Sequence, residues 1–402
     1  MTGSALDELL AFRDEFPILE RSNYLVSNSL GAMPRAVPER LADYAREWSE
    51  LGVRAWAKGW WEMPVRVGDA IAPLIGAGPG SVSMQPNVSI AQSIVLSAMD
   101  FSGERNTIVM TELDFPSVRY AIEELARKLG ARVVVVPSDD GLTIDEGRLL
   151  EAIDESVRLV CISHVLFKSA YVMDADAICA HAHSVGAMVS LDSYHSVGVI
   201  PVDVVRSGVD FLTGGVLKWL CGGPGAAFLY ASPAVRGKLE PALTGWQAHR
   251  HPFAFAQEMD YADGIERWLT GTPSIASLFA ATEGPSIVLK AGMDRIRDKS
   301  IRQTEWLIAA ADSRGYRVHA PRDSARRGGT VAFDVPNGRE VAQYLLSRDI
   351  IVDYRVGAGI RVAPHFYTRD EELDACIGAI DECLATGEWK RFAQAARATV
   401  VT

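Results

Sequence analysis

Between residues 106 and 231, short runs of β-branched and apolar residues alternate with segments of helical periodicity. The runs are continuously apolar instead of apolar at every second position, a pattern typical of strands buried on both faces. Strands that alternate with amphipathic helices favour a largely parallel sheet covered by helices on each side. We therefore predict an α/β fold with strands at residues 106–111, 131–136, 158–165, 186–191, 210–214 and 226–231.

Functional side chains follow several of these runs. Asp192 ends one run, His195 comes three residues later, and Lys218 follows the next run, 26 residues after Asp192. Phe115 and Ser163 also lie at or just past strand ends. Ligands of parallel sheets bind beyond the carboxyl ends of the strands, so we expect these residues to share one site.

A lysine and a carboxylate are the two groups that pyridoxal 5'-phosphate (PLP) chemistry requires. The lysine holds the cofactor as a Schiff base, and the carboxylate keeps the pyridine nitrogen protonated. The cationic nitrogen in turn favours the ionised carboxylate and lowers its pKa. Taken singly, Lys218 is also consistent with a surface lysine and Asp192 with a helix cap; together they predict a PLP site.

Other segments add weaker indications. A helix is expected from about residue 90, with Asn87 or Ser89 as its cap, and a helix N-terminus with small polar residues suits a phosphate. Trp56 belongs to an aromatic cluster that is typical of core or subunit-interface packing as well as of a ligand wall. His249 and His251 have no further ligand residue nearby, so we expect no metal.

The totals restrict the class of protein. A chain of 402 residues that is 48% hydrophobic is long enough for one large domain and one smaller one. A net charge of −11 gives no reason to expect nucleic acid or an anionic membrane as partner. The 5 cysteines include no CxxC pair, and no apolar window reaches the length of a membrane span, so we expect a cytoplasmic protein.

Several motifs, spread over nearly the whole chain, resemble kynureninase, in the class-V branch of the fold-type-I PLP enzymes. They are Tyr24-Leu25 with Asn28-Ser29-Leu30-Gly31, Phe115-Pro116-Ser117, Asp192-Ser193-Tyr194-His195, Lys218 with Gly222-Gly223-Pro224-Gly225, Gly245-Trp246 with His249, Gly271-Thr272-Pro273, Asp353-Tyr354-Arg355 and Ile360-Arg361-Val362.

The resemblance implies fold type I: a large PLP domain with a mainly parallel, seven-stranded-type sheet between helices, and a small α+β C-terminal domain. We expect residues 1–50 to pack with the small domain, residues 51–285 to form the large domain and residues 286–402 the small one. It also implies a homodimer whose active sites are completed across the subunit interface.

The resemblance assigns roles to particular residues. It indicates that Lys218, Asp192 and His195 are catalytic. The implied cofactor-binding residues are Asn87, Val88, Phe115, Ser117, Ser163, Asp192, His195, Lys218, Trp246 and Thr272. An L-α-amino acid substrate is expected to contact Arg361, Trp56, Asn28 and Ser29, with Arg361 gripping its α-carboxylate.

The chain departs from kynureninase at positions that affect the chemistry. Leu217 stands where that family usually has a tyrosine used in proton transfer, and Gln247-Ala248 and Lys168-Ser169 also differ. Loss of a proton donor removes a factor of about 10²–10⁴ in rate. We therefore expect cleavage at Cβ, either β-elimination from an S-substituted cysteine or kynurenine hydrolysis. Alternatives are decarboxylation with oxidative deamination, amino transfer, or a PLP-binding scaffold without activity.

Overall fold

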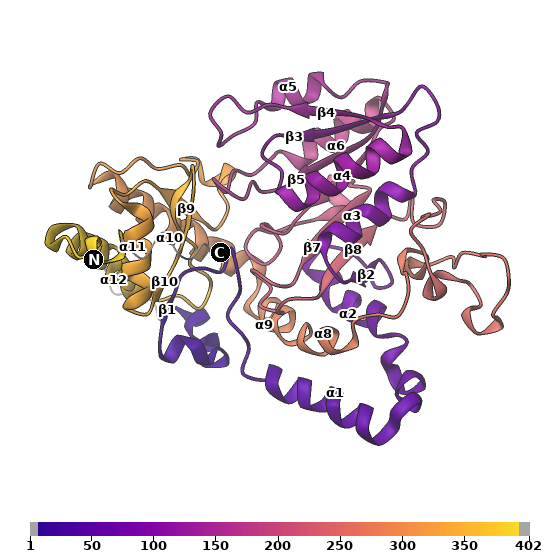
Figure 1. The fold of residues 1–402 in the computed structure, drawn as a ribbon, viewed down its shortest axis with the longest axis horizontal. Coiled ribbons are helices and arrows are strands. Elements are labelled where there is room, and N and C mark those ends of the chain that lie inside the picture. The colour runs from indigo at the N-terminus through magenta and orange to yellow at the C-terminus, as the bar shows by residue number, and fades with distance from the viewer. Residues whose placement is uncertain (1–6, 394–402) are drawn as a thin grey trace.

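The computed structural model describes residues 7–393, which form a seven-stranded sheet and a smaller three-stranded sheet side by side (Figure 1). The strand order of the large sheet is β2-β8-β7-β6-β5-β3-β4. Its strands are β2 (Val82–Gln85), β3 (Thr107–Thr111), β4 (Arg132–Val136), β5 (Val157–Ser163), β6 (Met188–Asp192), β7 (Phe211–Gly215) and β8 (Ala227–Ala231).

Five strands of the large sheet, β3 to β7, run parallel. At one edge β8 pairs antiparallel with β7, and β2 pairs antiparallel with β8. The predicted parallel core is therefore confirmed. Two details were not predicted: β8 runs antiparallel to β7, and β2 was not among the expected strands. β2 is only four residues long and gains its place by pairing with β8, far along the chain, which a local pattern does not reveal.

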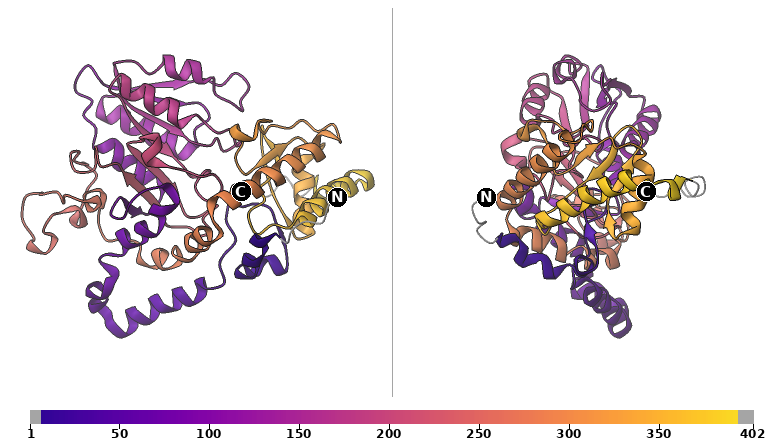
Figure 2. Two further views of the ribbon diagram at one scale, coloured as in Figure 1. Left: turned by 180° about the vertical axis from the view of Figure 1, so that it is seen from behind. Right: turned by 90° about the vertical axis from the view of Figure 1, so that its left-hand side faces the viewer.

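Helices cover both faces of the large sheet, as the continuously apolar strands predict (Figure 2). Side chains of α3 (Val88–Ser97) and α4 (Pro116–Leu129) build the core on one face. The opposite core contains side chains from α2 (Met63–Ile71), α5 (Glu146–Glu151), α6 (Ala175–Ser184), α7 (Val204–Ser207), α8 (Ile275–Ala280) and α9 (Glu283–Ala291).

The small sheet is antiparallel in the order β11-β12-β9 and has a core of its own. Its strands are β9 (Val331–Phe333), β11 (Asp353–Arg355) and β12 (Gly359–Val362), and its helices are α10 (Met293–Asp312), α11 (Gly338–Ser347), α12 (Asp370–Thr386) and α13 (Lys390–Ala393). The helical spacing of apolar residues over 287–313 predicts a single helix. The structure divides it into α9 and α10 at Gly292, whose φ of 84° breaks the helical path.

The first part of the chain connects the two sheets. β1 (Asn23–Tyr24) pairs in parallel with β10 (Ile350–Ile351). The sequence pattern at 350–355 predicts one strand, which the structure divides into β10 and β11. Buried Arg13 donates to both oxygens of Glu372 on α12. Helix α1 (Val37–Leu51) then crosses to α8 along the lower edge of Figure 1.

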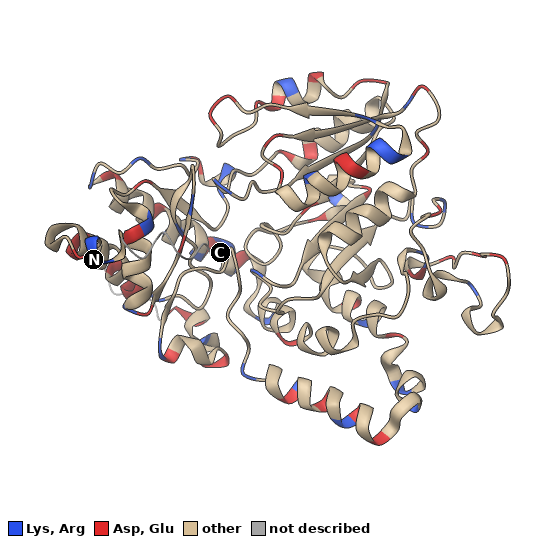
Figure 3. Ribbon diagram, viewed as in Figure 1, with Lys and Arg blue, Asp and Glu red and all other residues tan. Residues whose placement is uncertain are grey.

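Charged residues lie on helices and loops, and the strands of the large sheet are almost free of them (Figure 3). A sheet buried on both faces has no water for a charge, so the few polar groups at strand ends stand out as candidates for function.

No helix within residues 7–393 is long and apolar enough to cross a membrane.

Candidate active site

A cavity of about 210 Å³ opens at the carboxyl ends of the parallel strands. After β3 the chain adds β4 on one side and then β5 on the other, so the strand order reverses between β3 and β5. Crevices at such reversals are the usual ligand sites of open α/β sheets. The cavity brings together eight of the expected site residues: Asn87, Val88, Phe115, Ser117, Ser163, Asp192, His195 and Lys218.

Lys218 lies three residues beyond β7 and extends into this cavity. Its Nζ is 2.6 Å from Nε2 of His195 and lies over the rings of Tyr194, at 4.5 Å, and Phe115, at 5.5 Å. Burial lowers the pKa of Lys218 below that of an exposed lysine, and the charge of Arg361 acts in the same direction, while Asp192 opposes it. A lysine with a lowered pKa is neutral, and therefore nucleophilic, for a larger fraction of the time.

Asp192 is the last residue of β6, paired in register with Ser163 on β5 and Thr213 on β7. Oδ1 accepts a hydrogen bond from the Tyr194 N–H at 2.9 Å, and Oδ2 has no donor within the described residues. Burial raises the pKa of Asp192 and the Asp114 carboxylate acts in the same direction, while the Tyr194 N–H and the charge of Lys218 oppose it. A positively charged pyridine nitrogen would compensate the charge of Asp192, so this carboxylate suits PLP.

Two helix N-termini meet at the cavity, which suits the phosphate of PLP. α3 begins at the Asn87 cap, whose side chain accepts from the Ile90 N–H at 3.0 Å, and α4 begins directly after Phe115. The first N–H groups of a helix have no acceptor within the helix, and the helix dipole is positive there. Val88 and Ser117 line the cavity at these two ends, so the donor set fits an anion.

The turn at residues 28–31 packs directly against the lysine segment. The Gly31 N–H donates to the Leu217 carbonyl at 2.8 Å, and a Cβ on Gly31 would lie 2.1 Å from the Lys218 carbonyl oxygen. Only glycine allows this approach. Asn28 in the same turn is buried with neither amide atom hydrogen-bonded, but neither Asn28 nor Ser29 lines the cavity.

Leu217, next to the lysine, lines the cavity with a side chain that cannot donate a proton. Tyr194 also lines the cavity, and its ring packs against Gly215 on β7, where a Cβ would lie 2.4 Å from the hydroxyl oxygen.

Arg361 on β12 is buried and paired across the small sheet with Asp353, which accepts from its Nε at 2.8 Å and from its Nη2. Nη1 donates to the Phe167 carbonyl at 2.6 Å, and the Phe167 ring lines the cavity. These bonds use three of the five guanidinium donors. Its hydrogen bonds to the described residues leave the other two donors unused, and Arg361 does not line the cavity in the single chain.

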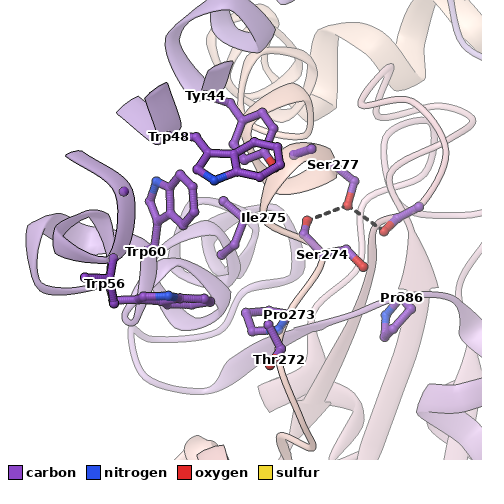
Figure 4. Close-up of a pocket in the computed structure, with 14 residues that line it drawn as sticks. Tyr44, Trp48, Trp56, Trp60, Pro86, Thr272, Pro273, Ser274, Ile275 and Ser277 are labelled. Carbon is purple, nitrogen blue, oxygen red and sulfur yellow. Dashed lines mark hydrogen bonds between the residues drawn. The ribbon is translucent and has the colours of Figure 1, made fainter. Parts of the chain in front are cut away.

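Trp56 and Thr272 lie in a different place. They line a second, open cavity of about 710 Å³, with Trp56 and Trp60 on one side and Thr272 and Pro273 on the other (Figure 4). Within one chain the structure therefore does not bring them to Lys218.

Trp246 does not line the Lys218 cavity either. It is exposed, and it belongs to the chain segment that links β8 to α8 and projects from the large domain (Figure 1). Its ring stacks on Phe255 at 5.8 Å and meets Trp61 edge-on at 4.9 Å.

Six of the residues that line the cavity were not among the expected site residues, and two of these six, Tyr194 and Phe167, are aromatic. Tyr194 lies within the Asp192-Ser193-Tyr194-His195 motif, and its position beside Asp192 was the available signal. Phe167, whose ring meets Phe115 edge-on at 5.2 Å, lies in a loop after β5 that has no motif of its own.

The chain is similar to proteins of one family over nearly its whole length. The family model described as Aminotransferase class-V matches residues 24–375. The chain belongs to the class-V aminotransferase family. It is 32% identical over 411 residues to the kynureninase of Burkholderia pseudomallei (strain 1106a), covering 98% of this chain and 97% of that one. It is 34% identical over 401 residues to the kynureninase of Pseudomonas fluorescens, covering 96% and 94%.

Several solved structures share the fold of this class-V chain. The cysteine desulfurase of Thermococcus onnurineus NA1 superposes with a TM-score of 0.82 at 22% identity, covering 96% of this chain and 100% of that one. The cystine C–S lyase C-DES, in complex with cysteine persulfide, gives 0.79 at 20% identity, covering 91% and 98%. A C-DES variant carries glycine covalently linked to its PLP cofactor. Family and relatives thus imply PLP as the cofactor.

Proposed function

We propose that this chain is a PLP-dependent enzyme that cleaves a bond at Cβ of an L-α-amino acid, with β-elimination from an S-substituted cysteine as its main reaction. The observation that carries the proposal is the meeting of Lys218 and Asp192 in one cavity between two helix N-termini. Membership of a family whose relatives include kynureninases supports the amino-acid substrate.

When bound, PLP supplies an electron-accepting ring conjugated to the substrate amine. The remaining roles in the reaction belong to residues of this chain. Lys218 would hold the cofactor covalently and would serve as the base for the Cα proton of the substrate. Asp192 would stabilise positive charge on the ring nitrogen, and Arg361 would hold the α-carboxylate with its two free donors.

His195 assists Lys218 through the 2.6 Å hydrogen bond between their nitrogens. Burial keeps the pKa of His195 well below its usual value, so the imidazole is neutral. A neutral imidazole accepts from the protonated lysine without adding a second positive charge to the cavity.

Leu217 favours elimination over kynurenine hydrolysis. Hydrolysis must add water to a ketone and move several protons at the Cγ side of the substrate, which a nearby hydroxyl assists. Elimination from an S-substituted cysteine expels a thiolate, which needs little protonation because its pKa is low. A leucine at the cavity wall is compatible with the second reaction.

The test uses purified protein loaded with PLP. Its absorbance is followed on addition of L-kynurenine and of S-substituted cysteines, with anthranilate, thiol, pyruvate, aldehyde and keto-acid products measured. Thiol and pyruvate without anthranilate are the expected products. Rapid anthranilate formation would contradict the elimination proposal, and aldehyde formation would replace Cβ cleavage by decarboxylation.

Leu217→Tyr is expected to raise kynurenine turnover, by about 10²-fold or more, because it places a proton donor beside Lys218. Leu217→Phe, which adds the ring without the hydroxyl, is the matched control. The measurement is the rate of anthranilate formation from L-kynurenine, compared between the two variants. If tyrosine gives no more anthranilate than phenylalanine, residue 217 does not set the reaction.

We also propose a homodimer in which Trp246, Thr272 and Trp56 complete the partner's site. Two surfaces support this proposal: the exposed aromatic side chains Trp246, Phe253 and Phe255, and the open cavity of Figure 4. Trp246→Ala is expected to weaken self-association in analytical ultracentrifugation and PLP retention together. Leu346→Ala, which changes an exposed apolar residue on α11, is the control. A fully active monomer would contradict the proposal.

A further inference from the structure

Asp114 is a buried carboxylate at the strand-order reversal that none of the steps above uses. It follows β3 and directly precedes Phe115. Oδ2 accepts from the Thr111 N–H at 2.7 Å, and Oδ1 accepts from the Ser163 N–H at 2.6 Å. One side chain therefore joins the end of β3 to the end of β5.

This link replaces backbone pairing that the two strands lack. The ladder between β3 and β5 ends at the pair of Val109 and Val160, although β5 continues to Ser163. Beyond that point the strands need another partner for their N–H groups, because buried donors without acceptors are costly. The carboxylate of Asp114 accepts from both strands across the crevice.

The two strand ends that Asp114 joins each lead to residues that line the cavity. On the β3 side, the backbone continues into Phe115, whose ring lies 5.5 Å from Nζ of Lys218. On the β5 side, Ser163 is in register with Asp192. We infer that Asp114 is a positioning residue that fixes the spacing between the Phe115 wall and the Ser163–Asp192 wall of the cofactor cavity.

This inference rests on the proposed PLP site and is tested by Asp114→Asn. Asparagine offers one oxygen and one NH₂ group, so one of the two backbone N–H groups would face a donor instead of an acceptor. We expect at least about tenfold weaker PLP binding. We also expect a changed visible circular dichroism band per bound PLP, because the ring is held differently between the two walls.

Asp210→Asn is the matched control. Asp210 is also buried and accepts a strand N–H, that of Val189, at 2.8 Å, as well as contacting His183. It lies before β7 and beside the beginning of β6, at the end of the sheet opposite the cavity. We expect D210N to lower the free energy of unfolding while leaving PLP affinity and the dichroism per bound PLP unchanged.

The outcomes separate this inference from the proposed function. Wild-type protein that binds no PLP would contradict the proposed function. Wild-type binding with D114N and D210N alike in affinity and dichroism would overturn the positioning role alone. If D114N gives no folded protein, D114E with D210E carries the same comparison, because glutamate keeps both acceptors but moves them by one methylene group.

Discussion

Replacing Lys218 with alanine is expected to lower turnover by at least about 10⁴-fold and to leave PLP bound only reversibly. No other lysine lines the cavity among residues 7–393, and the neighbouring aromatic faces of Tyr194 and Phe115 cannot replace an amine. Gel filtration should therefore remove the cofactor from Lys218→Ala but not from the wild-type protein. Loss of colour and loss of turnover are the two measurements.

Lys168→Ala is the control for this result. Lys168 lies over the ring of Phe167, at 5.9 Å, in the loop after β5, but does not line the cavity. It should retain the cofactor and most of the activity. Biological activity that survives Lys218→Ala would point instead to a PLP-binding scaffold, and retention of colour would mean that another lysine is attached to the cofactor.

Asp192→Asn is expected to lower kcat by about 10²–10³-fold while the protein stays folded. Asparagine keeps an oxygen for the Tyr194 N–H, 2.9 Å from Oδ1 in the wild type, but loses the negative charge that a protonated ring nitrogen needs. The measurements are kcat and the pH titration of the bound cofactor's absorbance. An unchanged kcat would show that the ring nitrogen does not depend on Asp192.

The same variant has a predictable effect on the protein without cofactor. Because burial raises the pKa of Asp192, the folded protein binds its proton more tightly than the unfolded chain does. Stability should therefore fall as pH rises from the unfolded-state value through the raised pKa, with the charge of Lys218 offsetting part of the loss. Asp192→Asn should remove that contribution, which urea unfolding at a series of pH values would measure. A wild-type profile identical to that of the variant would contradict it.

The parallel core was predictable because its evidence is local. Each strand from β3 to β7 is a continuous apolar run, and parallel strands place their carboxyl ends together, so Asp192, Ser163 and Lys218 were expected in one site. β2 was not predicted, because its four residues, which end before Pro86, form a strand only by pairing with β8.

The features of the site that the sequence did not predict have similar physical causes. Trp56 and Thr272 share a second cavity because α1 and the segment before α8 meet away from the crevice, which motif spacing does not encode. Asp114 was not predicted because its two hydrogen bonds join backbone groups of different strands, one of them 49 residues further along the chain. The pairing of Arg361 with Asp353 was not predicted, because it appears only once β11 and β12 are in register.

The first strand of the chain has a consequence for the order of events during synthesis. Tyr24 pairs with Ile351 and Val26 with Ala363, so residues 24–26 cannot take their final positions until those partners have been synthesised. The turn that supports Lys218 belongs to the same early segment. A nascent chain can thus form its parallel sheet before the turn at residues 28–31 is held in place beside Lys218.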